Sequence, residues 1–137
     1  MAKRKRQDKY GKELATLTAR ARRMFNHHKA KAQKKHWVLD YGSDDLVKLA
    51  KRAVATGSTR CPLCDEELDV DTFSFDHRVP TSRGGKASIK NLWVTHVRCN
   101  RMKWTLYLED YLKFRDFLRA LPEYARKVIE AKMLGGF

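Results

Sequence analysis

The sequence lacks the features that mark membrane and secreted proteins. None of its apolar runs approaches the roughly 18–20 residues needed to cross a bilayer. Residues 1–6 are basic, but no apolar segment follows them, so this start does not have the pattern of a secretory signal. These absences favour an intracellular protein without a membrane partner.

Cysteine is scarce as well. The chain has three cysteines, Cys61, Cys64 and Cys99, and an odd number in an intracellular protein argues against a disulfide framework. Internal repeats and low-complexity segments are also missing, and 137 residues fit one ordinary domain. The cysteines are therefore candidates for metal binding.

Acidic residues are few, with 16 Asp and Glu against 30 Lys and Arg, and the formal net charge is +14. The excess is concentrated in residues 1–36, whose 13 basic and 2 acidic side chains give +11. Such a segment favours a polyanionic partner, because neutralising phosphates releases condensed counterions. A solvated tail is the alternative. An anionic membrane is less favoured, because the apolar stripe of this segment is narrow and broken by charge.

Apolar spacing and turn residues predict an α+β chain that is rich in helix. Ser43 fits an N-cap, followed by acids in the first helical turn. In chain order we expect disorder over 1–10, a basic amphipathic helix over about 12–35, a helix from Ser43 to Gly57, strands near 73–75 and 92–95 around a loop at 80–85, and helices from about 99, over 108–121 and over 122–136.

Two short motifs have the spacing of a zinc site. Cys61 and Cys64 form a CxxC, and His96 and Cys99 form an HxxC about thirty residues later. Each pair suits a tight turn that aims both side chains at one point, and a Cys3His set suits Zn²⁺. Four protein ligands leave no open position, so we expect the zinc to be structural. The alternatives are a redox CxxC, a surface His96 beside incidental cysteines, and a site that binds no metal.

Polar residues between and after these pairs form a second pattern. Residues 75–85 contain the pair Asp76-His77, then a proline and a Gly-Gly; Asn91 precedes a strand, and Asn100 follows a cysteine and precedes a lysine by three residues. Taken together, these residues resemble the HNH endonuclease motif of the ββα-metal (His-Me finger) class. Asn91 and Asn100 stand fourteen and twenty-three positions after His77, as in HNN variants of the family.

The resemblance covers about a third of the chain and implies a zinc-stapled ββα core that hydrolyses DNA to 5′-phosphate and 3′-hydroxyl ends. It implies that His77 is the general base, and a neutral imidazole suits that role near pH 7. It makes Asp76 and Asn100 the ligands of one catalytic cation, Mg²⁺ or Mn²⁺, and Asn91 a brace for the hairpin. His96 departs from the commonest pattern, in which a fourth cysteine stands.

Basic residues surround this pattern and are candidates for contacts with phosphates. They are Arg78, Arg83, Lys86, Arg98, Arg101 and Lys103. For Trp93 and Trp104 we expect core packing rather than stacking on bases. Taken singly, each motif residue has an ordinary explanation: His77 in a surface pair, Asn91 in a turn, Asn100 as a helix cap.

The leading hypothesis is a metal-dependent DNA endonuclease with a basic N-terminal arm (1–36), a nuclease core with the zinc site (37–104) and a C-terminal helical extension (105–137). One alternative is a zinc-stabilised nucleic-acid-binding module without catalysis. Another is a nuclease subunit active only within a larger assembly such as a phage DNA-packaging machine, since free-standing members of this size are common in phages and mobile elements. We expect the cytoplasm of a bacterial or phage-infected cell.

Overall fold

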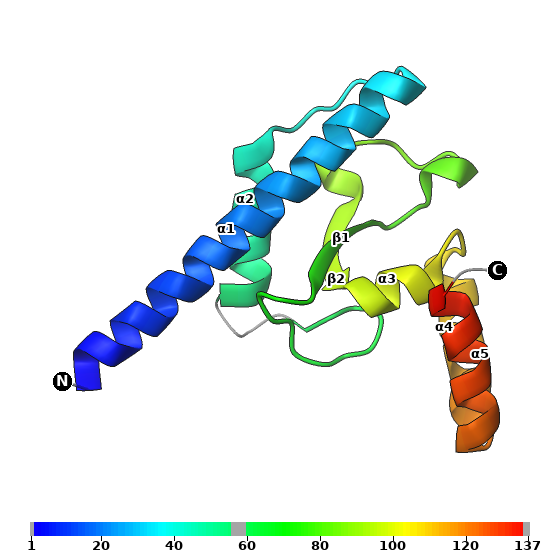
Figure 1. Cartoon of the computed structure of the whole chain (residues 1–137). Helices are drawn as coiled ribbons and strands as arrows, with labels where there is room; N and C mark the ends of the chain where they lie inside the picture. The colour runs from blue at the N-terminus through cyan, green and yellow to red at the C-terminus, as the bar shows by residue number, and fades with distance from the viewer. Residues whose placement is uncertain (1, 56–59, 136–137) are drawn as a thin grey trace.

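The computed structural model describes residues 2–55 and 60–135 and has an α+β architecture, as predicted. Its described residues form a two-stranded antiparallel sheet surrounded by α-helices, with the longest helix crossing one side of the molecule (Figure 1). No helix among these residues is both long and apolar enough to span a membrane.

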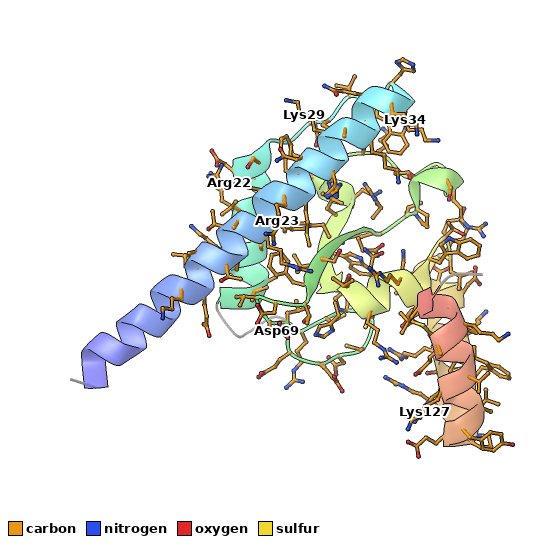
Figure 2. All side chains as sticks on the ribbon, viewed as in Figure 1. Arg22, Arg23, Lys29, Lys34, Asp69 and Lys127 are labelled. Atoms are coloured by element: carbon orange, nitrogen blue, oxygen red, sulfur yellow. The ribbon has the colours of Figure 1, made fainter. Side chains whose placement is uncertain are left out.

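Helix α1 (Ala2–Lys35) is longer than the sequence pattern indicates. Residues 2–10 are helical, which contradicts the disorder expected there. Lys, Arg and Gln are good helix formers, and the segment has no proline, so the helix continues through Gly11. Leu17 and Ala21 are buried in the core, where α1 packs against α2. Arg22, Arg23, Lys29 and Lys34 project along its length (Figure 2).

Helix α2 (Ser43–Ala50) continues into a π-helical turn, Lys51–Ala55. Ser43, which the sequence predicts to be the N-cap, is instead the first residue of the helix. The N-cap is Gly42. A side chain from inside the helix makes the capping hydrogen bond: the Asp45 carboxylate accepts from the Gly42 backbone N–H over 2.8 Å. The predicted helix stop, Gly57, lies outside the described residues.

Strands β1 (Phe73–His77) and β2 (Leu92–His96) form the predicted hairpin. The register pairs Phe75 with Val94 and Asp76 with Trp93. Because side chains alternate along a strand, β1 presents its phenylalanines and His77 to one face and Asp76 to the other. Helix α1 covers the first face and α3 (Val97–Lys103) the second. The hairpin therefore places Asp76 and His77 under different helices.

Helices α4 (Leu108–Ala120) and α5 (Glu123–Gly135) complete the described chain. Tyr111 and Leu118 of α4 are buried, and α5 contacts α3. The apolar spacing of residues 122–136 predicts that Val128 points inward, but this residue is 56% exposed. The apolar pattern of α5 therefore overstates its burial.

Candidate functional site

The predicted zinc ligands come together at one end of the hairpin. Cys61 and Cys64 lie on a turn in which the Asp65 N–H donates to the Cys61 carbonyl over 2.8 Å. His96 ends β2, and Cys99 lies in the first turn of α3. The four ligand atoms all lie within 4.8 Å of one another.

The chemistry of this cluster fits zinc. The His96 Nε2 lies 2.8 Å from the Glu67 carbonyl, so that nitrogen is the one that donates and Nδ1 is left to face Cys64 Sγ at 3.2 Å. The hydrogen bond from Cys99 lowers the pKa of Cys61 to about 4 and raises that of Cys99. Metal binding needs thiolates. The cluster is compatible with a structural zinc ion.

Helix α4 packs against this zinc cluster. Arg115 Nη1 donates to the Leu63 carbonyl inside the CxxC turn over 2.9 Å. Tyr111 is buried beside the cluster, and burial raises the pKa of its hydroxyl to about 12. The turn that contains Cys61 and Cys64 thus connects the end of the hairpin to the C-terminal helices.

His77 ends β1 on the face covered by α1. Its imidazole stacks on that of His28, with ring centroids 6.0 Å apart and an interplanar angle of 29°. Burial lowers the pKa of His77 to about 4, and the nearby His28, Lys31 and Lys103 add to that effect. The imidazole is therefore neutral at pH 7, the state that accepts a proton.

His28 is a site residue that the sequence motifs do not include. Its Nδ1 lies 2.8 Å from the Tyr41 hydroxyl, and burial, with Lys31 and His27, lowers its pKa. A signal was available: with Leu17, Ala21 and Met24, His28 occupies successive positions of one helical stripe, where the other three are apolar. A histidine on an apolar stripe faces the structure beneath it.

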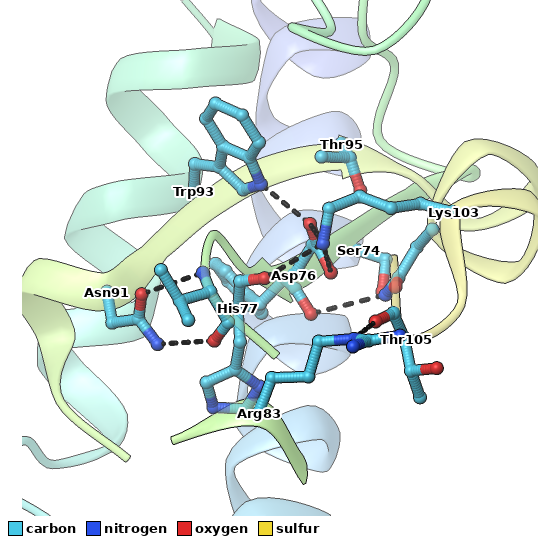
Figure 3. Close-up of polar contacts among 12 residues, drawn as sticks. Ser74, Asp76, His77, Arg83, Asn91, Trp93, Thr95, Lys103 and Thr105 are labelled. Carbon is cyan, nitrogen blue, oxygen red and sulfur yellow. Dashed lines mark hydrogen bonds and ion pairs between the residues drawn. The ribbon is translucent and has the colours of Figure 1, made fainter. Parts of the chain in front are cut away.

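Asp76 lies on the opposite face of β1, in a closed network (Figure 3). Its Oδ2 accepts from the Trp93 indole N–H at 2.8 Å and lies 3.1 Å from the Lys103 Nζ. Burial raises the pKa of the Asp76 carboxyl, and Trp93 and Lys103 oppose that rise. The Lys103 side chain is fully buried, which contradicts the prediction that it contacts a phosphate.

The two asparagines have different positions. The Asn100 Nδ2 donates to Ser74 Oγ at 3.3 Å and to the Phe75 carbonyl at 3.4 Å, so α3 is held against β1. Asn91 spans the hairpin loop: its Oδ1 accepts from the Val79 N–H at 3.0 Å, and its Nδ2 donates to the carbonyls of Val79 and Lys86, each at 2.9 Å.

The Gly-Gly of this loop has a steric cause. A Cβ on Gly85 would lie 1.8 Å from the Val79 carbonyl oxygen, and Gly84 has a φ of 89°, in the left-handed region. Only glycine fits both positions, so the loop folds back closely enough for Asn91 to bridge it.

Asp76, His77 and Asn100 line one open cleft of about 650 Å³, together with Lys31 and Trp104. The structure thus brings together three of the four predicted catalytic residues. Asn91 instead lines a neighbouring hollow beside the loop. The cleft lies where α1, the hairpin and α3 meet, with the end of α5 at its rim.

Two oxygen donors in this cleft fit a hard cation such as Mg²⁺, which is held by few protein ligands with waters and phosphate oxygens completing its shell. Asp76 Oδ1 accepts one long hydrogen bond, from the Lys103 Nζ at 3.5 Å, whereas Oδ2 is held by two donors at shorter distances. Among the described residues no hydrogen bond reaches Asn100 Oδ1. The two Oδ1 atoms are therefore the candidate ligands.

The predicted phosphate-contact residues are not gathered in this cleft: Arg101 lines it, whereas Lys86 lines the hollow beside the loop and Arg98 lines a hollow beside the zinc ligands. Arg98 pairs with Glu130 at 2.8 Å, and Arg83 donates to the Thr105 carbonyl. Five of the six basic side chains are exposed: Arg78, Arg83, Lys86, Arg98 and Arg101. Trp93 is half-buried, but Trp104 is 70% exposed, so the core packing predicted for Trp104 is wrong.

Comparison with protein families agrees with the motif. Residues 61–105 match the family model described as HNH endonuclease. This match confirms the predicted HNH domain, which here consists of a hairpin and a helix beside the Cys3His cluster. The match points to a nuclease in general. A comparison with curated proteins gave no match.

Proposed function

We propose that the chain is a metal-dependent endonuclease that hydrolyses phosphodiester bonds of DNA in the cleft between α1, the hairpin and α3. The observation that carries this proposal is the convergence of His77, Asp76 and Asn100 on one cleft of about 650 Å³. The three come from a strand end and a helix, on opposite faces of the sheet, yet they border the same space.

His77 acts as the general base. Its neutral imidazole takes a proton from a water molecule, and the water oxygen forms a bond to phosphorus while the bond from phosphorus to the 3′ oxygen breaks. The departing 3′ oxygen takes up a proton from solvent and becomes the 3′-hydroxyl. The stack on His28 supports this role, because it fixes the plane of the imidazole and so the direction of its lone pair. Asn91 maintains the loop that follows His77 and keeps the strand end in place.

Asp76 and Asn100 are the residues that would hold the cation, because both offer oxygen ligands and both line the cleft. When bound, Mg²⁺ or Mn²⁺ supplies Lewis-acid stabilisation of the charge that develops on the phosphate oxygens. Trp93 and Lys103 hold the Asp76 Oδ2 at 2.8 and 3.1 Å, whereas Oδ1 has only the longer contact of 3.5 Å with Lys103, so Oδ1 is the oxygen more available to a cation. Lys31 and Arg101 also line the cleft and bind the phosphates on either side of the scissile bond.

The test is nicking of supercoiled plasmid with Mg²⁺ or Mn²⁺ added or omitted. Omission is preferred to a chelator, because a chelator would also remove zinc. We expect cation-dependent nicking by the parent, none by His77→Ala, and unchanged nicking by His27→Ala, whose exposed histidine adjoins His28 on α1. The zinc content of each variant is measured alongside. Parental rates in His77→Ala would contradict the assignment of the base.

A second candidate is a zinc-stabilised nucleic-acid-binding module without catalysis. The observation that favours it is the buried ion pair of Asp76 with Lys103, because a cation already neutralises the carboxylate. DNA binding without cleavage under either cation would support this candidate, or a nuclease that needs a partner assembly.

A further inference from the structure

Trp104 occupies an unusual place for a large apolar side chain. It directly follows α3, four residues after Asn100, and it lines the cleft that Asp76 and His77 also line. Its side chain is 70% exposed. Folding therefore gains little from burying this indole, so its position has to be explained by something other than the core.

The backbone of Trp104 is held in a conformation that few non-glycine residues adopt. Its φ is 49° and its ψ is −122°, and such strain persists only where the surroundings enforce it. The Trp104 N–H donates to the Asn100 carbonyl and the Leu106 N–H to the Lys103 carbonyl, each over 3.0 Å. On the next residue, Arg83 donates to the Thr105 carbonyl (Figure 3). These three hydrogen bonds hold the backbone at Trp104 in place without the help of a ligand.

We propose that Trp104 is a nucleobase-binding residue that stacks on an unpaired base next to the scissile phosphodiester. An exposed indole offers a flat π-surface on which any base can stack. Lys31 and Arg101 line the same cleft and supply the positive charge that follows a sugar-phosphate backbone. The part of this proposal that concerns the scissile bond rests on the proposed nuclease function.

The substrate class follows from the geometry. In a duplex each base is already stacked between neighbours, and exposing one to an aromatic side chain costs free energy. A single strand, or a duplex with unpaired bases at the cleavage point, avoids that cost. Trp104 thus directs the enzyme toward single-stranded or locally opened DNA.

The test measures binding by fluorescence anisotropy in the His77→Ala background, without an added divalent cation. The probes are a labelled thymidine oligomer, an oligomer of equal length with abasic sugars, and a fully paired duplex of that length. The variants are Trp104→Ala and Trp104→Phe. The matched control is Tyr124→Ala, an aromatic side chain 77% exposed at the start of α5, about 15 Å along that helix from the residues that reach the cleft.

We expect Trp104→Ala to weaken binding of the thymidine oligomer by roughly 5- to 100-fold, while binding of the abasic oligomer and the duplex stays within about twofold. Trp104→Phe retains most of the affinity, and Tyr124→Ala changes none of it. Equal losses on base-bearing and abasic oligomers, or no loss at all, would overturn the stacking role. Because this readout needs no cleavage, failure of the plasmid assay would refute the nuclease and leave this result standing.

Discussion

Lys103 is the residue whose environment departs furthest from its sequence pattern. Its ammonium and the Asp76 carboxylate are 0% and 6% exposed and 3.1 Å apart. Breaking a buried pair by removing one partner leaves an uncompensated charge and costs about 3–5 kcal/mol. We therefore predict that Asp76→Asn lowers the free energy of unfolding in urea by an amount of that order.

The control for this prediction is a pair on the surface. Lys127 and Glu123 on α5 lie 3.0 Å apart, but both side chains are 69% exposed, so Glu123→Gln should change stability by less than about 1 kcal/mol. Pairing Asp76→Asn with Lys103→Met removes the stranded charge and should recover most of the loss. If Asp76→Asn costs no more than Glu123→Gln, the ion pair does not stabilise the core.

The sequence predicts the position and exposure of single side chains only in part. The spacing of His77, Asn91 and Asn100 identifies the motif, because these positions sit on one hairpin and the helix that directly follows it. The spacing does not say which side of α3 faces the sheet. Lys103 and Trp104 are neighbours with opposite exposure, and only the packing of α3 on β1 determines that Lys103 turns inward and Trp104 outward.

At the scale of elements, the packing of α1 on the hairpin predicts a dependence on pH. Burial lowers the pKa of His28 in the folded protein, whereas the unfolded chain takes up a proton there near pH 6.5. Acidification below about pH 6.5 therefore favours the unfolded state, and the loss continues until the folded pKa is reached. Above that window His28 is neutral in both states and contributes no pH dependence.

The measurement is the free energy of unfolding between pH 7 and pH 5 for the parent, His28→Gln and His27→Gln. His28→Gln removes the proton uptake, so its stability should decline less steeply, by up to about 1.4 kcal/mol per pH unit. His27 is exposed, and its replacement should leave the slope of the parent unchanged. The other histidines and the zinc ligands are common to all three proteins. Parallel curves for His28→Gln and the parent would contradict the prediction.

The elements were predictable to different degrees, and the reason is the range of the interactions that form them. The strands predicted near 73–75 and 92–95 follow from short apolar runs between turn residues, and the two members of each metal-ligand pair are only three residues apart in the chain. The contact of His28 with His77 joins residues 49 positions apart. The exposed Val128 shows the reverse error: a helical apolar stripe predicts a face, but not whether a partner covers it.

For the whole molecule, the net charge of +14 predicts that DNA binding weakens steeply with salt. Lys31 lines the cleft, and Lys34 follows it by three residues on the same face of α1. Figure 2 shows Lys34 on α1 and Lys127 on α5, far from one another. Lys127 is already paired with Glu123, so it serves as the matched control.

Each phosphate contact contributes about 0.7 to the slope of log affinity against log salt for a single strand. Lys31→Gln and Lys34→Gln should each reduce the slope for a thymidine oligomer by about that amount, and together by about twice as much. Lys127→Gln should leave it unchanged. The quantity is the slope from anisotropy titrations over a series of salt concentrations, because an affinity at one salt concentration does not separate charge from contact area. An equal reduction in Lys127→Gln would mean that the protein attracts DNA through its overall charge, and that α1 does not form a track for the strand leading into the cleft.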